Sequence, residues 1–234
     1  MDLFPQTKET KHSASDIKFP DRHHLFTVEE RDIHVLNTYV APLYQPRQSP
    51  VSLIVGYSSL REAEILRSFH EDSFGIAHPT SKVIGCNIVE RRGAGTTDSL
   101  DQLYMGHFAG DAKDSYTWLK GFMALDIRGR LSYDIAYIRN PDLYSVRDWS
   151  AIFARAVEMT ATSGVVITLI REDDVASFKR LTAYLETKYG IRPELVTETA
   201  MSLEDDPLRQ HFLLGVFRGS ARCDTSGARN AGRS

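Results

Sequence analysis

Short apolar runs alternate with amphipathic segments along most of the chain. The runs are rich in Val, Ile and Leu, which is typical of strands buried on both faces of a sheet. Most segments between them carry apolar residues at helical spacing. This alternation predicts an α/β domain with a doubly wound, mostly parallel sheet. The predicted strands are 51–57, 81–88, 103–108, 133–139, 164–170, 194–200 and 211–218, and the predicted helices are 59–70, 114–127, 147–161 and 174–190.

The end of the pattern is more specific. The last two predicted strands, 194–200 and 211–218, are joined by a polar segment that shows no helical pattern. Two strands joined without a crossover helix pair as an antiparallel hairpin. The sequence therefore predicts a seven-stranded sheet whose last strand is antiparallel.

The segments before and after the alternating strands and helices complete the predicted domain organisation. Thr27 and Glu30 match a capping box at the start of an amphipathic helix over 27–44. The proline-rich residues 45–50 separate this helix from the main domain. The sequence thus predicts a flexible N-terminal segment (1–26), a helical extension (27–50), the α/β domain (51–219) and a disordered tail (220–234).

Composition narrows the class of protein. The chain has 234 residues and a net charge of −3, without a basic block that would indicate a nucleic-acid partner. Two cysteines, Cys86 and Cys223, cannot form a disulfide framework. No secretory leader pattern and no apolar stretch of membrane-spanning length is found. We expect a cytoplasmic protein that binds a small-molecule substrate and neither nucleic acid nor membrane; homo-oligomerisation is left open.

The chemistry is expected where the strands end, because ligands bind beyond the carboxyl ends of the strands in open α/β sheets. A strand–turn–helix, "SLIVGYSSLREA", follows the first strand, and the fourth strand leads into "RNPDLY". The candidate ligand-binding residues after the first four strands are Gly56, Tyr57, Ser58, Asn87, Ile88, Asp111, Ala112, Arg139 and Asn140.

Three of these stretches, "VIGCNIVE", "FAGDAKD" and "YDIAYIRNPDLY", together with the terminal hairpin, resemble the class I S-adenosylmethionine-dependent methyltransferase family over roughly 51–219. The resemblance implies a Rossmann-like fold and S-adenosyl-L-methionine as cofactor. It also implies a role for three residues. The turn at Gly56 would face the methionine part, Asn87 the ribose and Asp111 the adenine.

The sequence departs from the family pattern at the first two strands. Ile54 stands where the family has an acid, and Ser58 and Leu60 replace two glycines of the turn. Asn87 replaces the ribose carboxylate, so hydrogen bonds to a ribose would lack charge assistance. Two readings stay open: a methyltransferase acting on a small molecule, or a binding or scaffold protein of the same fold that has lost its cofactor.

The remaining candidates have simpler explanations beside the functional one. Asp142 and Tyr144, in the loop after the fourth strand, are the candidate catalytic residues if a base is needed. Gly56 can serve backbone geometry alone, and Asp111 can cap a helix. The acids at 172–174 suit a helix N-terminus better than a metal, so no metal is expected. A dinucleotide oxidoreductase is disfavoured because G-x-G-x-x-G is missing.

Overall fold

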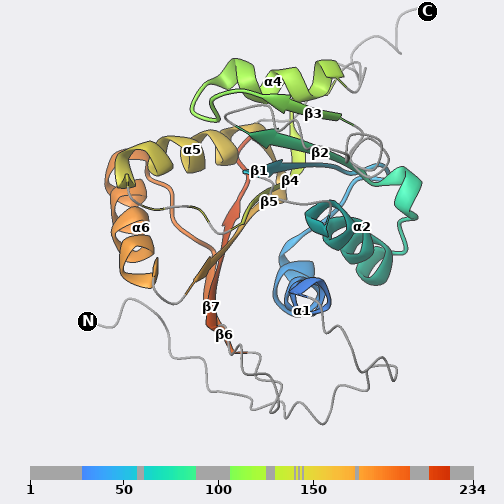
Figure 1. Cartoon of the computed structure of the whole chain (residues 1–234), viewed down its shortest axis with the longest axis horizontal. Coiled ribbons are helices and arrows are strands. Elements are labelled where there is room, and N and C mark those ends of the chain that lie inside the picture. Colours follow the sequence, from blue (N-terminus) through green and yellow to red (C-terminus); the bar gives the residue numbers. More distant parts are fainter. Residues whose placement is uncertain are drawn as a thin grey trace, which may run out of the picture.

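The structure is a computed structural model that describes residues 28–56, 61–87, 106–124, 130–139, 141, 143, 145–171, 174–200 and 211–221 (Figure 1). The helices are α1 (Val28–Val35), α2 (Arg61–Phe74), α4 (Ser115–Ala124), α5 (Val146–Met159) and α6 (Val175–Tyr189), with short turns η2 (Leu36–Val40), η3 (Ala41–Leu43) and η4 (His78–Thr80). The strands are β1 (Val51–Val55), β2 (Lys82–Asn87), β3 (Gly106–Ala109), β4 (Tyr133–Arg139), β5 (Thr160–Arg171), β6 (Leu195–Ala200) and β7 (His211–Arg218).

The described strands form one seven-stranded sheet in the order β3-β2-β1-β4-β5-β7-β6. Every pair among β1 to β5 is parallel, and β7 is antiparallel to both β5 and β6. The predicted doubly wound sheet with an antiparallel last strand is confirmed. The order reverses beside β1, which places the crevice for a ligand at the carboxyl ends of β1, β2 and β4.

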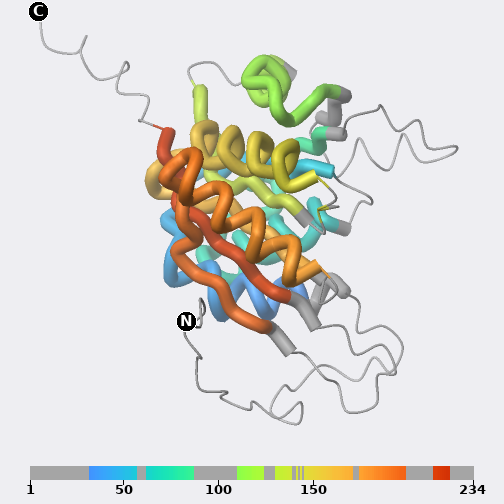
Figure 2. The backbone as a smooth tube through the Cα atoms, turned by 90° about the vertical axis from the view of Figure 1, so that its left-hand side faces the viewer, coloured from blue at the N-terminus to red at the C-terminus, as the bar shows by residue number. Residues whose placement is uncertain are grey.

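Helices cover both faces of this sheet (Figure 1). One core contains large side chains from α4, α5 and α6, and Figure 2 shows α5 and α6 side by side. The other core contains Val35, Leu36 and Val40 from the N-terminal segment together with residues of α2. None of the helices in the described part of the chain is long and apolar enough to cross a membrane.

The predicted N-terminal helix is present, but it changes its winding twice. It is α-helical to Val35, widens to a π-turn over Leu36–Val40 and tightens to a 3₁₀-turn over Ala41–Leu43. Pro42 lies in the first positions of that last turn, where its missing N–H is tolerated. The helical period therefore predicted the element and missed the change in winding.

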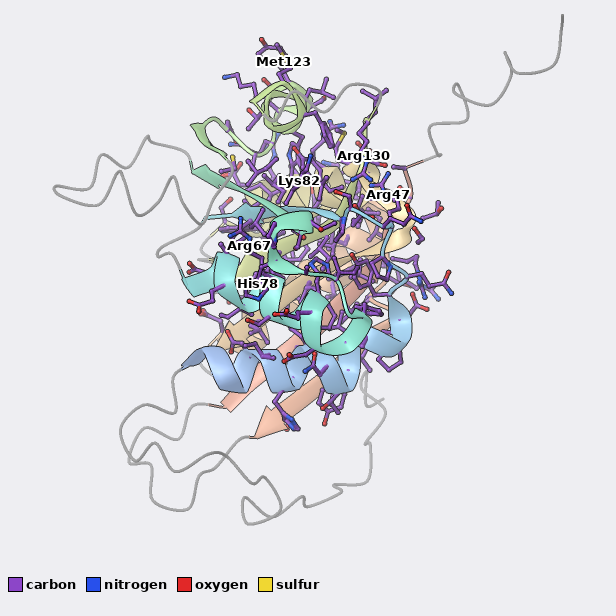
Figure 3. All side chains as sticks on the ribbon, turned by 90° about the vertical axis from the view of Figure 1, so that its right-hand side faces the viewer. Arg47, Arg67, His78, Lys82, Met123 and Arg130 are labelled. Atoms are coloured by element: carbon purple, nitrogen blue, oxygen red, sulfur yellow. The ribbon has the colours of Figure 1, made fainter. Side chains whose placement is uncertain are left out.

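A buried ion pair fastens the segment after this helix to the amino edge of the sheet. Arg47 donates from Nε and Nη2 to the two carboxylate oxygens of Asp134 at 2.7 and 3.0 Å, and Asp134 is fully buried. The backbone N–H of Val51 donates to the same carboxylate at 2.8 Å. Arg130 Nη1 lies 3.7 Å from it, and Figure 3 shows Arg130 and Arg47 close together. Asp134 thus joins the segment before β1 to the start of β4.

A second buried polar cluster, formed by Tyr44, His70 and Ser81, joins α2 to the segments before β1 and β2. The buried ring of His70 is 3.0 Å from the Tyr44 hydroxyl through Nε2 and 2.7 Å from the Ser81 hydroxyl through Nδ1. Burial lowers the pKa of His70 from 6.5 to about 4 and raises the pKa of Tyr44 well above its usual value. Both rings are therefore uncharged at neutral pH.

The chain after β7 packs against the start of β5 with no room for a side chain. A Cβ on Gly219 would lie 2.1 Å from the carbonyl oxygen of Ala161 and 2.5 Å from that of Thr160. We expect Gly219→Ala to lower the free energy of unfolding by about 1–3 kcal/mol, because backbone atoms must move to admit the methyl group. Denaturant titration measures the change. The exposed neighbour Ser220 provides the control, and Ser220→Ala should change stability by about 0.5 kcal/mol or less. Equal effects of the two substitutions would contradict the packing argument.

Candidate functional site

The register of the sheet brings the predicted strand-end residues to one edge. β1 ends at Val55, and Asn87 of β2 and Arg139 of β4 stand one position beyond the partners of Val55, level with Gly56. Asn87 is in turn the partner of Ala109, the last residue of β3. Four strands therefore end side by side at the point where their order reverses.

Gly56 occupies a backbone conformation that other residues rarely adopt. Its φ is +74°, and its N–H donates to the carbonyl oxygen of Cys86 at 2.8 Å. A Cβ built on Gly56 would have no heavy atom of the described residues within 4 Å. Backbone geometry alone thus explains the glycine, and no side chain among the described residues fills the space that its missing Cβ leaves.

The floor of the site between β2 and β3 is closely packed. Cys86 is buried, which raises the pKa of its thiol to about 12, and its Sγ lies 3.9 Å from the carbonyl oxygen of Gly110. A Cβ on Gly110 would lie 2.6 Å from Cγ2 of Thr117 in α4. The thiol is therefore protonated and unreactive at neutral pH, and Gly110 lets α4 pack closely against the end of β3.

Ala112, predicted with Asp111 as a cofactor-binding residue, is buried in the core. Its carbonyl oxygen accepts from Nε1 of Trp118 at 2.7 Å, and the hydroxyl of Tyr133 donates to the Trp118 carbonyl at 2.5 Å. The ring of Phe122 stacks on Tyr133 with centroids 4.3 Å apart. These contacts fix the turn that carries Asp111.

Asp111 itself is half-exposed and is already in contact with cationic and N–H groups. Its Oδ1 accepts from the backbone N–H of Lys113 at 2.9 Å, and its Oδ2 lies 3.4 Å from the Lys113 ammonium. That ammonium also lies 3.3 Å from Oδ1 of Asp148 in the first turn of α5. The hydrogen bond to Asp148 raises the pKa of Lys113. The pKa of Asp148 is lowered by its contacts with Ser145 and Lys113.

Lys113 thus bridges Asp111 and Asp148. The structure places only some of the site residues that were predicted from the sequence. Asp111 and Ala112 form the β3 side of the site, and Gly56 lies at the end of β1. Asn87 and Arg139 are placed by their strand positions alone. The predicted residues Tyr57, Ser58, Ile88, Asn140, Asp142 and Tyr144 lie outside the described residues. Their proposed roles stay predictions.

The structure describes only a few residues of the two loops that follow β4 and β5 at this edge of the sheet. Pro141 and Leu143 are buried, so alternate residues anchor the first of these loops to the core. Glu172 and Asp173 lie outside the described residues, and Asp174 is the N-cap residue of α6 without a side-chain capping bond. Over the described residues, no three side chains of His, Cys, Asp or Glu gather as metal ligands.

Two contacts at this end of the sheet were not predicted from the sequence. The bridge through Lys113 and Asp148 spans 35 residues, and its one local signal is Ser145 followed three positions later by Asp148, a helix-start pattern. The second contact joins the hydroxyl of Tyr137 to Oδ2 of Asp32 at 3.4 Å, across 105 residues. No periodic pattern in the sequence marks either pair.

Comparison with solved structures decides the fold. The methyltransferase domain of the bacterial CtHen1-CN matches with a TM-score of 0.50 and 14% identity, over 82% of this chain and 100% of that one. The chain has the class I methyltransferase fold. Lower TM-scores are found for the PH0226 protein of Pyrococcus horikoshii OT3 (0.49, 13% identity, 87% of this chain and 97% of that one) and for an rRNA methylase of Streptococcus thermophilus (0.45, 12%, 81% and 97%).

Sequence comparison adds no closer relative. No protein-family model matches the chain, and no curated protein matches it significantly. The methyltransferase fold is therefore established by the sheet order, the antiparallel last strand and the structural match together, whereas activity and cofactor have to be argued from the site.

Proposed function

We propose that the chain is an S-adenosylmethionine-dependent methyltransferase that acts on a small molecule. The observation that carries the proposal is the left-handed Gly56, level with Asn87 at the point where the strand order reverses, with no described heavy atom within 4 Å of a Cβ built on it. An adenosine ligand lying along this edge would extend from Gly56 past Asn87 toward Asp111. The negative net charge favours a small acceptor over a nucleic acid.

Each of the three residues has a group suited to one part of the cofactor. The backbone at Gly56 can approach a ligand closely because no side chain intervenes. The amide of Asn87 can donate to and accept from ribose hydroxyls. The carboxylate of Asp111 keeps further lone pairs, beyond those used by Lys113, for an adenine amine.

The bound sulfonium would supply an electrophilic methyl group, whose bond to sulfur breaks as the acceptor's lone pair forms the new bond. Such a displacement depends mainly on alignment and on exclusion of water. The chain would contribute a closely packed floor at Cys86 and Gly110 and the rigid turn at Ala112. Asp142 and Tyr144 remain the proposed residues for deprotonating an acceptor.

Calorimetric titration with S-adenosylhomocysteine tests the proposal. We expect weak binding to the natural chain and about fivefold to tenfold tighter binding to Asn87→Asp, because a charged acceptor forms hydrogen bonds stronger by about 1 kcal/mol. Gly56→Val should abolish binding, since a β-branched side chain is strained at positive φ and would enter the open space.

Gly75→Val is the matched control for Gly56→Val. Gly75 also has a positive φ (+65°) and open space around it, but it follows α2 and precedes η4 at the amino edge of the sheet. Gly75→Val should be destabilised in a similar way and still bind. If neither the natural chain nor Asn87→Asp binds, the alternative holds: a binding or scaffold protein that keeps the fold without the cofactor.

A further inference from the structure

The bridge through Lys113 joins two segments whose strands are not neighbours in the sheet. Lys113 lies in the turn between β3 and α4, and Asp148 lies in the first turn of α5, which follows β4. In the sheet, β3 and β4 are separated by β2 and β1. Helices α4 and α5 contribute to the same core cluster and therefore cover the same face. The bridge thus links the two segments that flank the carboxyl ends of β1 and β2, where Gly56 and Asn87 lie.

Both segments are anchored in the core, whereas the charged groups of the bridge face solvent. Ala112, in the turn, and Leu143, in the loop before α5, are buried and belong to the same core cluster. The side chains of Asp111, Lys113 and Asp148 are 46%, 40% and 54% exposed. A ligand can therefore reach the Asp111 carboxylate without any change in the core.

One ammonium is shared between two carboxylates. Nζ of Lys113 lies 3.4 Å from Oδ2 of Asp111 and 3.3 Å from Oδ1 of Asp148. The hydrogen bond to Asp148 raises the pKa of Lys113, which keeps the ammonium charged at neutral pH. Both distances exceed the usual charge-assisted length of about 2.7–2.9 Å, so the ammonium can tighten on either acid. A second donor at Asp111 competes for its lone pairs and favours the contact with Asp148.

We propose that Lys113 is a positioning residue that transmits the binding of a ligand at Asp111 to the start of α5. A ligand amine that donates to Asp111 releases Lys113 toward Asp148, and the tightened pair fixes the first turn of α5. The loop that leads into this turn carries Asp142 and Tyr144, the residues proposed to act on the acceptor. The inference rests on the proposed function and deepens it, because the cofactor then binds before the acceptor.

Hydrogen exchange tests this coupling with S-adenosylhomocysteine as the ligand. Two amides report on the first turn of α5: the N–H of Asp148 donates to Oγ of Ser145 at 3.3 Å, and the N–H of Trp149 donates to the Ser145 carbonyl oxygen at 3.0 Å. In the natural chain, a concentration that saturates the protein in calorimetry should slow the exchange of both amides about threefold or more.

Substitutions of Lys113 separate this role from a merely structural one. Lys113→Met removes the ammonium at an exposed position, so the variant should fold and bind the ligand, but the slowing should disappear. Lys113→Arg should restore part of the slowing, since a guanidinium can pair with both acids.

Lys120→Met is the matched control. Lys120 is a cation of α4 whose ammonium lies over the ring of Tyr116, 5.4 Å from its centroid. Its substitution removes the same charge and should leave the slowing intact. Exchange that the bound ligand leaves unchanged in the natural chain, or equal slowing in Lys113→Met, overturns the inference while leaving the proposed function intact. If the natural chain does not bind S-adenosylhomocysteine, the proposed function fails and this inference fails with it.

Discussion

Asp134→Ala will lower the free energy of unfolding by about 3–5 kcal/mol, a large part of the total stability of a domain this size. The carboxylate is fully buried and accepts from Arg47 and from the N–H of Val51. Its removal takes the charged acceptor from the guanidinium, which keeps its hydrogen bond to the carbonyl oxygen of Ser132, and takes the carboxylate acceptor from the amide. The side chain of Arg47 is 28% exposed, which lets water solvate part of its charge. The expected value therefore lies toward the lower end of the range.

Chemical denaturation at neutral pH measures this change. Glu194→Ala is the control, because Glu194 also forms a two-bonded pair with an arginine, Arg218, at 2.7 and 2.8 Å, but both side chains are about 40% exposed. Exposed pairs contribute about 1 kcal/mol or less. A loss of similar size in both variants would show that burial of Asp134 contributes nothing of its own.

Acid will destabilise the fold through His70 by about 3 kcal/mol between pH 7 and pH 4. The unfolded chain takes up a proton near the ordinary His pKa of 6.5, whereas in the folded chain burial holds the pKa of His70 at about 4. The unfolded state therefore binds more protons between these values, and stability is lost as pH falls through this window. Above about pH 6.5 the contribution is complete.

The pH dependence of His70→Gln isolates this contribution from that of the carboxylates. The variant loses contacts with Tyr44 and Ser81 at every pH, but its stability should fall by about 3 kcal/mol less than that of the natural chain over the same window. NMR provides a direct check. A ring resonance of His70 that titrates near pH 6.5 in the folded protein would refute the prediction.

Burial on both faces explains why most of the sheet could be predicted. β4 was predicted at 133–139 and is found there, because its apolar run is bounded by polar turns. β5 begins at Thr160 rather than at 164. The helix predicted over 147–161 ends at Met159, so Thr160 and Ala161 belong to the strand and not to the helix. Ala161 forms a bridge with Ala221, and the register with β4 shifts over this stretch. A contact with the far end of the chain thus overrode the local pattern.

The candidate site could be predicted only where strands end. Gly56 and Asp111 follow predicted strands, so their edge of the sheet was evident from the sequence. The partners that set their surroundings come from other elements: Lys113 joins Asp111 to Asp148, and Asp32 meets Tyr137 across 105 residues. Residues brought together by helix packing leave no mark of spacing in the sequence.

The place of β7 has a consequence for how the protein is made. β7 lies between β5 and β6, and in the described sheet β6 pairs with no other strand. On the ribosome, β6 leaves the exit tunnel before β7 and has no neighbour to join. The backbone hydrogen-bonding groups on the β7 side of β5 are also unpaired until β7 is made. Assembly of this side of the sheet must therefore follow synthesis of residues 211–218, which leaves an open strand edge for a chaperone to shield while translation finishes.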